Sequence, residues 1–574
     1  MNGVDDLALG ANFHDEVCKL LPELVSSEEE FPSRHALSDH LLSPQTLPPD
    51  PERCAITAVI DHAIPFAHRL LTTTGGFSRV ASIWLQETPV TRRRDDIPFG
   101  QEFRGAELDR LRGAGTAHVL DEDSLYRELG LLNPAGRNRW LMRAKTHGAA
   151  VIGTAAGYRP ADPNGLQHPV IAVGLPDRAL ADTSGAAMPL LLETAIAFII
   201  SRARLLAREM SANGKKVRPP VVINISLGIT AGPRDGHSRL ERLQDMLSRG
   251  PVPDLGPVRF VLAAGNTRAQ TLLGVLEPGQ SIGWRLPPDD RTPSEVQIWS
   301  AALKAGSPAI SLEVTLPDGR MVASDFVPPK HKGTQIARIC DPDGGELARL
   351  VLQAVPRGSK LRQCLSIIAP PTVAEKSGVA LAPAGTWRLR LRGVTPGPCD
   401  MVVQRDDRLI GFPRAGRQSY LVEKGYSPRK KNGQWKGPDP TPAKTLIRRN
   451  GTCNAYAWGS EQLRCGAVYL QRHRLPGYAS LLQDGTGGDV LAPSDRGPAL
   501  PGMLAPGTRG ASMQALSGTS ISAPRLTRWI SRRFAAGERF ADRAALIAAA
   551  KAAHPSESGT PKVEPDLPWP HFDD

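Results

Sequence analysis

The sequence contains no long apolar segment. Its longest apolar run, Met188 to Ile200, is interrupted by Glu193 and is shorter than the roughly 20 residues that a membrane-spanning helix needs. The N-terminus is acidic and lacks the apolar centre of a secretory signal peptide. We therefore expect a cytoplasmic protein without a membrane partner, unless an unconventional route exports it.

Cysteine is scarce and scattered. The seven cysteines are odd in number and none stands in a CxxC pair, which argues against a disulfide framework and against a zinc site. Acidic residues clustered at the spacing of a calcium loop are also lacking. The sequence therefore predicts no cofactor and no required metal, and structural calcium is not indicated. The cysteines are Cys18, Cys54, Cys340, Cys364, Cys399, Cys453 and Cys465.

Aromatic residues are few as well, at 5% of the chain. The densest basic stretch, Arg405 to Arg449, is interrupted by Gly, Pro and Asp and lacks the aromatic interleaving of a nucleic-acid reader. The net charge of +12 is spread along the chain, which favours a solvated basic surface over a dedicated anion-binding face. We expect no nucleic-acid partner.

The first half of the chain alternates short apolar, β-branched runs with helical patterns. Such runs are typical of buried parallel strands, and their alternation with helices indicates βαβ units. The expected class is therefore α/β, with helices flanking a parallel sheet in three layers. The expected strands are 55–60, 80–85, 170–174, 221–226 and 258–263, with helices at 147–157 and 190–210, and the charged stretch 92–139 reads as surface helix and loop.

The pattern changes after Asn266. Short alternating runs such as Ala309 to Leu316 and Gly385 to Leu391 are separated by turn signals such as Pro317-Asp-Gly319, as in a β-sandwich or jelly roll. Helical periodicity returns only at 525–553. The predicted organisation is an N-terminal lead-in at 1–50, a catalytic domain in two parts at 51–268 and 441–553, an inserted β-rich domain at 269–440, and a C-terminal tail at 554–574.

One serine has the surroundings of a nucleophile. Ser520 lies in Gly518-Thr-Ser-Ile-Ser-Ala-Pro524, among small residues at the start of a predicted helix. A helix start supplies free N–H groups and the positive end of the dipole, which favour negative charge. The same segment taken alone fits an ordinary helix cap.

Three polar residues complete a pattern with Ser520. Asp61 directly follows the strand 55–60, His147 begins a Gly- and Ala-rich helix, and Asn266 ends the strand that closes with Ala263-Ala-Gly-Asn266. Each residue alone fits a turn, a cap or a structural role. Together they occur in the order Asp, His, Asn, Ser, and parallel strands bring their carboxyl ends to one edge of a sheet.

These segments resemble the subtilisin-like serine proteases, the subtilase family, in which the triad follows the same chain order. The resemblance covers about 51–268 and 441–545. It is carried by Val59-Ile-Asp61, His147-Gly148, Val222-Ile-Asn-Ile-Ser-Leu-Gly228, Ala263-Ala-Gly-Asn266 and the Ser520 segment.

The resemblance implies a serine endopeptidase that acts on protein or peptide substrates through an acyl-enzyme. Ser520 would attack the peptide carbonyl, His147 would carry the proton, and Asp61 would orient His147. Asn266 and the Ser520 N–H would stabilise the oxyanion. Ser226, Leu227 and Gly228 would pair with the substrate backbone, and Ala263, Ala264 and Gly265 would wall the pocket for the residue before the scissile bond.

The chain departs from the family pattern beside two of these residues. His62-Ala63 follows Asp61 where the family has Ser or Thr and then Gly, and Ala149-Ala150 follows His147-Gly148 where the family has Thr and then His. His62 could perturb Asp61 or face solvent, and we favour solvent. Ser522 stands where Ala is commoner.

Two spacings indicate insertions. His147 follows Asp61 by 86 residues and Ser520 follows Asn266 by 254, which leaves room for the β-rich domain. Subtilases with a jelly roll between the oxyanion Asn and the nucleophile exist, among them the clostridial spore-germination group. The insertion could gate the cleft, bind a regulatory partner or rigidify the enzyme.

Two other functions compete with an active endopeptidase. The altered neighbours of Asp61 and His147 are compatible with a catalytically silent subtilase fold that acts as a protein-binding module. An unrelated serine hydrolase or esterase is disfavoured because the GxSxG elbow is absent around Ser520.

Overall fold

The computed structural model of the chain describes residues 38–88, 94, 96–132, 139–181, 185, 187–211, 215–374, 378, 380–406, 416–471, 474–554 and 559–569. Most of the predicted N-terminal lead-in, up to residue 37, lies outside the described residues. So do residues 555–558 and 570–574 of the predicted C-terminal tail.

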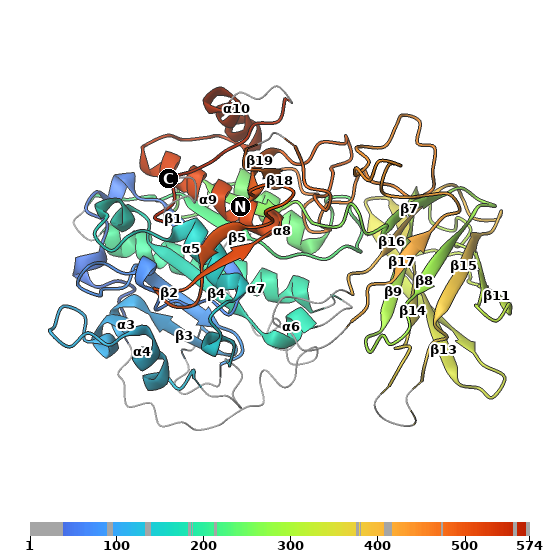
Figure 1. The fold of residues 1–574 in the computed structure, drawn as a ribbon, viewed down its shortest axis with the longest axis horizontal. Coiled ribbons are helices and arrows are strands. Elements are labelled where there is room, and N and C mark those ends of the chain that lie inside the picture. The colour runs from blue at the N-terminus through green and yellow to red at the C-terminus, as the bar shows by residue number, and fades with distance from the viewer. Residues whose placement is uncertain are drawn as a thin grey trace.

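An eight-stranded sheet organises the first part of the chain and its end (Figure 1). Its strands pair in parallel except for the antiparallel edge strand β3. All residues of these strands are buried except Arg464 and Tyr469 of β18, which are half-buried, since helices cover both faces. In spatial order the strands are β19 (Val490–Asp495), β18 (Leu463–Tyr469), β6 (Val258–Ala263), β5 (Val221–Ile225), β1 (Ile56–His62), β4 (Val170–Leu175), β2 (Val80–Leu85) and β3 (Gln101–Arg104).

Helices cover both faces of the sheet, and alternate side chains of each strand pack against one set or the other. In β1, Ile56, Ala58 and Ile60 join the hydrophobic cluster that contains α7, whereas Val59 joins the cluster that contains α5. Strand side chains alternate between faces, so α7 and α8 lie opposite α5 and α9. The longer helices are α5 (His147–Ala156), α7 (Met188–Met210), α8 (Arg239–Arg249), α9 (Thr519–Ala535) and α10 (Arg543–Ala553), with α3 (Gly105–Arg112), α4 (Glu122–Glu128) and α6 (Asp177–Ala181) being shorter.

Strand β1 lies where the winding of the sheet reverses. From β1 the chain builds β2, β3 and β4 on one side, and then crosses to build β5 and β6 on the other. The loops that follow β1 and β5 leave the sheet in opposite directions, which opens a crevice at the carboxyl end of β1. Open α/β sheets usually bind their ligands in such a crevice. Asp61 and His62 are the last two residues of this strand.

Two antiparallel sheets occupy residues 273–422, which we call the β unit. They share one hydrophobic cluster that includes Trp284 and Trp387 of one sheet and Leu350 and Leu365 of the other. The five-stranded sheet has the order β11 (Met321–Ala323), β10 (Leu312–Thr315), β15 (Gly385–Leu391), β8 (Ser281–Leu286), β17 (Tyr420–Val422). The six-stranded sheet has the order β12 (Gly333–Cys340), β13 (Glu346–Arg357), β14 (Lys360–Ala369), β9 (Ser294–Leu303), β16 (Cys399–Val403), β7 (Leu273–Leu276).

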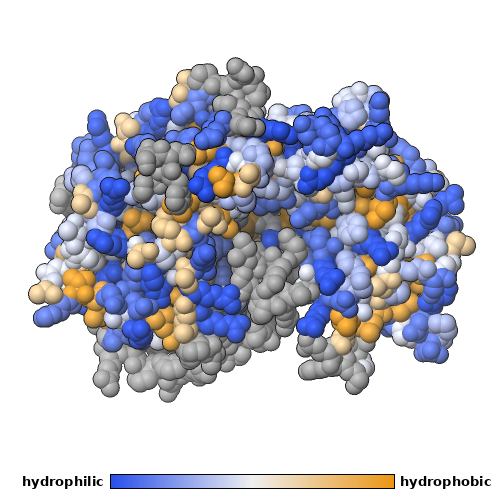
Figure 2. All heavy atoms as spheres, in the orientation of Figure 1, coloured by the Kyte–Doolittle hydropathy of each residue, from blue (hydrophilic) through white to orange (hydrophobic). Residues whose placement is uncertain are grey.

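Charged contacts attach the β unit to the α/β part. The Asp235 carboxylate accepts from the guanidinium groups of Arg357, at 2.7 Å, and Arg362, at 2.9 Å. Thr230 Oγ1 donates to the Val403 carbonyl at 2.7 Å. Figure 1 shows the β unit to the right of the α/β part, and Figure 2 shows a mostly hydrophilic face with scattered apolar residues.

The mixed α/β class expected from the sequence is confirmed in its coarse form, but several details were wrong. Strand β1 runs on to His62, because its pairing with β4 continues through Asp61 and His62, so Asp61 lies inside the strand. The expected surface stretch 92–139 contains the edge strand β3. The expected helix at 525–553 is two helices, α9 and α10, and the run 309–316 yields only β10.

No helix within the described residues is long and apolar enough to cross a membrane. The six cysteines within those residues are all unpaired.

A pair of buried carboxylates lies in the β unit. Thr292 Oγ1 donates toward both Asp290 and Asp406, and the Ser294 hydroxyl lies 3.3 Å from Asp290 and 3.1 Å from Asp406. Each aspartate is 1% exposed. Burial, reinforced by the neighbouring Asp290 charge, raises the pKa of Asp406 to about 8.

Because of this raised pKa, the stability of the β unit should depend on pH through Asp406. Its pKa in the folded protein lies above the value of about 3.9 in an unfolded chain, so the folded form binds the extra proton between those values. The stabilising contribution is complete below about pH 4 and is lost as the pH rises through about 8. The side chain of Asp406→Asn stays neutral at every pH. We therefore expect the free energy of unfolding of this variant to fall less steeply than that of wild type between about pH 4 and 8.

Urea unfolding at a series of pH values measures this slope. Asp343→Asn, on an exposed turn, serves as the matched control and should leave the slope as in wild type. Identical slopes for wild type and Asp406→Asn would contradict the assignment.

Candidate active site

A fully buried carboxylate forms the base of the candidate site. Asp61 is 0% exposed, and its Oδ1 accepts the His62 N–H at 2.7 Å. His147 Nδ1 lies 2.8 Å from Oδ1 and 3.0 Å from Oδ2. Because Asp61 occupies Nδ1, the other ring nitrogen, Nε2, is the one free to exchange a proton with a third group.

Local sequence fixes where His147 begins its helix. The Thr146 hydroxyl caps α5 by accepting the Ala149 N–H at 3.2 Å, and it donates to the Ala63 carbonyl at 2.9 Å. A β-carbon at Gly148 would lie 2.2 Å from the His62 carbonyl oxygen. Only glycine therefore allows α5 to approach the end of β1 closely enough for His147 to reach Asp61.

Ser520 and Asn266 converge on one point. Ser520 is the second residue of α9, where N–H groups have no partner within the helix. A β-carbon built on Gly518 would lie 3.1 Å from Asn266 Nδ2 and 3.4 Å from Ser520 Oγ. The amide donor and the hydroxyl therefore face the same small volume, which Gly518, with φ of 121°, leaves open.

Thr519 holds the Asn266 amide in this orientation, a role that the sequence interpretation missed. Asn266 Oδ1 accepts the Thr519 N–H at 2.9 Å and its hydroxyl at 3.0 Å, so Nδ2 must point the other way. The same hydroxyl accepts the Gly265 N–H at 3.0 Å. A threonine beside the nucleophile was visible in the sequence, but nothing there indicated its partner 253 residues away.

One cavity of about 260 Å³ contains all four predicted catalytic side chains. Its walls include Ser226, Leu227, Gly228, Ala263 and Gly265, which belong to the two segments that the sequence assigned to substrate binding. Ala264 is not among the lining residues, because its N–H bonds to Cys465 and its carbonyl accepts from Asn454 inside the protein. Further lining residues not foreseen from the sequence are Leu180, Thr230, Gln270, Arg405, Thr452 and Asn454.

Asn454 joins the two predicted walls. Its Nδ2 donates to the Leu227 carbonyl at 3.0 Å and lies 3.4 Å from the Ala263 carbonyl. A β-carbon at Gly228 would lie 2.2 Å from the Asn454 side chain, so glycine is required there. No backbone hydrogen bond engages Gly228 anywhere in the described part of the chain.

A buried hydrogen-bond network supports the loop before Ser520. The Tyr478 hydroxyl accepts the Gly518 N–H at 3.0 Å and donates to Asp495. Asp495 Oδ1 accepts the Ser517 hydroxyl at 2.6 Å and the Gly502 N–H at 2.7 Å. Burial raises the pKa of Tyr478, so its proton stays in place to donate.

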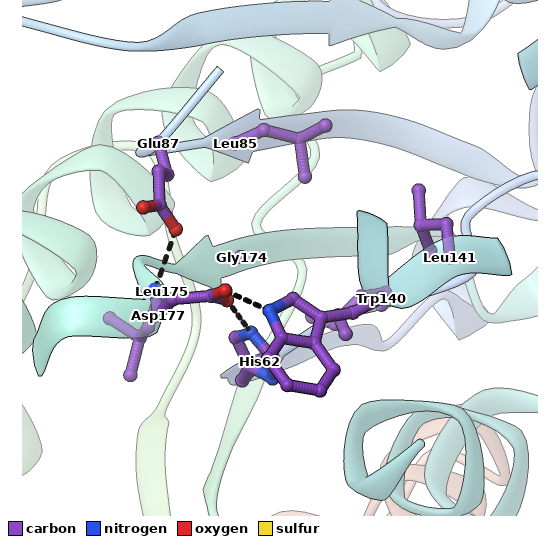
Figure 3. Close-up of a pocket in the computed structure, with 10 residues that line it drawn as sticks. His62, Leu85, Glu87, Trp140, Leu141, Gly174, Leu175 and Asp177 are labelled. Atoms are coloured by element: carbon purple, nitrogen blue, oxygen red, sulfur yellow. Dashed lines mark hydrogen bonds and ion pairs between the residues drawn. The ribbon is translucent and has the colours of Figure 1, made fainter. Parts of the chain in front are cut away.

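His62 does not face solvent, which corrects the interpretation favoured from the sequence. Figure 3 shows its ring directed at the Asp177 carboxylate, which also accepts from Trp140 Nε1. His62 is 8% exposed, and the Asp177 N–H donates to Glu87 at 2.6 Å. The His62 side chain is therefore bonded to Asp177, while its backbone N–H donates to Asp61.

The four residues are not all bonded to one another. Asp61 and His147 form a hydrogen-bonded pair, whereas no hydrogen bond joins Ser520 to His147 among the contacts of the described residues. Catalytic hydrogen bonds are often long without substrate and tighten when substrate binds. As for metals, no cluster of three His, Cys, Asp or Glu side chains suited to an ion occurs in the part of the chain that the structure describes.

This architecture, with a large parallel sheet flanked by helices and additional antiparallel sheets, is one that a protease of known structure shares. The likeness is to the CspB protease of Clostridium perfringens, with a TM-score of 0.55 and 15% sequence identity over 85% of this chain and 83% of that protein. At this identity the likeness concerns the fold. No family model matches the sequence, and no curated protein matches it.

The contact between Gly148 and β1 gives a test of the site's construction. Gly148→Ala would place a β-carbon against the His62 carbonyl and push His147 away from Asp61. We expect a loss of about 1–3 kcal/mol of unfolding free energy, as in overpacked cores. Thermal unfolding measures this loss.

Gly497→Ala is the matched control, since a β-carbon there meets open space. It should unfold as wild type does. A Gly148→Ala protein as stable as wild type would mean that α5 does not approach β1 as described.

Proposed function

We propose that this chain is a serine endopeptidase of the subtilisin-like class, with Asp61, His147 and Ser520 as the triad and Asn266 as oxyanion donor. The observation that carries the proposal is the buried Asp61 carboxylate bonded to His147 at the edge of a cavity that also holds Ser520 and Asn266. The proposal also assigns residues 269–440 to an inserted jelly-roll-like domain between the two parts of the catalytic domain.

In the proposed mechanism, His147 Nε2 takes the proton from the Ser520 hydroxyl as Oγ attacks the substrate carbonyl carbon. The carbonyl oxygen becomes an oxyanion that accepts from Asn266 Nδ2 and the Ser520 N–H. His147 then gives its proton to the leaving amine, the C–N bond breaks, and the acyl group remains on Ser520. Water attacks this ester as His147 takes its proton, the bond between the acyl carbon and Ser520 Oγ breaks, and His147 returns the proton to Oγ as the acid leaves. Asp61 stays ionised and stabilises the imidazolium.

The walls of the cavity support binding of an extended peptide. Gly228 has no backbone partner among the described residues, so a substrate strand could add to this segment by main-chain hydrogen bonds. Such pairing is tolerant of sequence. The protease likeness at the level of fold adds support, since that neighbour's name states proteolytic activity.

A catalytically silent fold that binds proteins is the second candidate. The observation that favours it is the missing hydrogen bond between Ser520 and His147 within the described contacts, together with the altered residues after Asp61 and His147. Reactivity of Ser520 separates the two functions, because a serine without a working base does not attack an electrophile rapidly.

A fluorophosphonate probe tests this reactivity directly. We expect labelling of the wild-type protein at Ser520 and none of Ser520→Ala, measured by intact mass and peptide mapping. Ser522→Ala is the matched control two residues away, where the hydroxyl donates to the Ala492 carbonyl rather than facing the cavity. A folded wild-type protein that fails to label would favour the binding module.

The Asn266 and Thr519 pair gives a kinetic prediction. We expect Asn266→Leu to lower kcat on a peptide substrate by about 10²–10³ with KM little changed, as when an oxyanion donor is lost. Thr519→Val should lower kcat by roughly tenfold, because it removes one of the two hydrogen bonds that orient the Asn266 amide and leaves only the bond from the backbone N–H. Thr519→Ser, which keeps the hydroxyl, should restore kcat. Equal kcat for Thr519→Val and wild type would rule out this positioning role.

A further inference from the structure

The Asn454 side chain lies between the two segments that wall the catalytic cavity. Strands β5 and β6 pair side by side, and at their carboxyl ends residues 226–228 form one wall segment and residues 263–265 the other. Asn454 Nδ2 donates to the Leu227 carbonyl of the first segment at 3.0 Å and lies 3.4 Å from the Ala263 carbonyl of the second. The amide therefore spans the gap between the two segments.

This gap is filled where Asn454 enters it. Its Cγ, Nδ2 and Oδ1 atoms each lie 2.2 Å from the position that a β-carbon on Gly228 would take. Across the gap, a β-carbon on Gly265 would lie 2.9 Å from Ser480 Oγ and 3.2 Å from the Asn454 backbone nitrogen. Asn454 also lines the cavity, and it is 6% exposed. The cavity between the wall segments thus ends on the Asn454 amide.

Hydrogen bonds on several sides fix the Asn454 amide in this place. Nδ2 directs its two N–H groups at the Leu227 and Ala263 carbonyls, and Oδ1 accepts the Tyr456 N–H at 3.0 Å. The Asn454 N–H donates to the Ala264 carbonyl at 2.8 Å. A buried amide with these partners cannot turn aside without losing hydrogen bonds. The Asn454 side chain therefore acts as a rigid end wall rather than as a ligand for an incoming group.

The gap is the place where the residue before the scissile bond would put its side chain. In the proposed reaction the substrate carbonyl lies between Ser520 Oγ and Asn266 Nδ2, and Asn266 directly follows segment 263–265. Side chains of an extended peptide alternate between its two sides. If the acyl side pairs with segment 226–228, its last side chain enters between the two wall segments, where it meets Asn454.

We propose that Asn454 restricts the residue immediately before the scissile bond to a small one, so that the substrates carry Ala, Ser or Gly there. A long or aromatic side chain would have to displace the Asn454 amide, which breaks hydrogen bonds and leaves two carbonyls without their donor. This inference rests on the proposed function, because Ser520 defines the scissile bond, and it names a class of substrate for that function.

Matched peptides test the restriction. A peptide that the wild-type protein cleaves is made with Ala, Ser, Leu or Phe before the cleaved bond, and mass spectrometry verifies that each version is cut at the same bond. We expect kcat/KM for Ala to exceed kcat/KM for Phe by about tenfold or more, the factor that corresponds to a lost hydrogen bond. A Phe peptide that is cleaved as well as the Ala peptide overturns the inference.

Variants at position 454 test the cause. Asn454→Ala and Asn454→Gly remove the amide and open the gap, so the Phe/Ala ratio of kcat/KM should rise by about tenfold or more. Asn432→Ala is the matched control, because Asn432 is exposed and does not line the cavity, and this variant should keep the wild-type ratio. A ratio that stays at the wild-type value in folded Asn454→Ala contradicts the assignment of the end wall to Asn454.

The outcomes separate this inference from the proposed function. Cleavage that is indifferent to Ala or Phe overturns the inference and leaves the peptidase intact. A folded wild-type protein that neither cleaves any peptide nor reacts with the fluorophosphonate overturns the proposed function, and the inference falls with it. If both Asn454 variants misfold, as thermal unfolding would show, the Ala/Phe ratio of wild type alone decides.

Discussion

The hydrogen bond between the Asp61 carboxylate and His147 is the constraint on which the site depends. An ionised carboxylate with no solvent contact is unfavourable unless charge or donors compensate it. Here the compensation comes from the His62 N–H and the His147 ring. This requirement explains why β1 extends past Asp61, why Thr146 caps α5, and why position 148 has no side chain.

The second half of the site depends on the far end of the chain. Strand β6 leads to Asn266, the β unit then occupies 273–422, and the chain returns to place Thr519 and Ser520 at the start of α9. Thr519 joins these two segments by bonding to Asn266 and Gly265. The β unit leaves and rejoins the fold close to the cavity, which is the physical reason that its residue Arg405 can line it.

Sequence patterns located much of this arrangement and failed in recognisable places. Buried parallel strands are mostly apolar, so β1, β2, β4, β5 and β6 were placed within a residue or two of their ends. Edge strand β3, Gln-Glu-Phe-Arg, carries charged side chains that pair with one another and resembles surface loop. Asn454, Tyr478 and Asp495 act through partners distant in sequence, and local sequence carries no signal for such partners. His62 was misjudged because its partner Asp177, the first residue of α6, is more than a hundred residues away in the sequence.

Proton NMR of the folded protein with ¹⁵N-labelled histidine tests the central claim most directly. A histidine Nδ1–H bonded to a buried carboxylate resonates far downfield, and the account predicts such a signal that disappears in Asp61→Asn and persists in Asp177→Asn. Asp177→Asn removes the charge that faces His62, so it distinguishes a signal from His62 from a signal from His147. A wild-type protein without this signal, or with one that only Asp177→Asn removes, would contradict the Asp61–His147 pair on which the proposed chemistry rests.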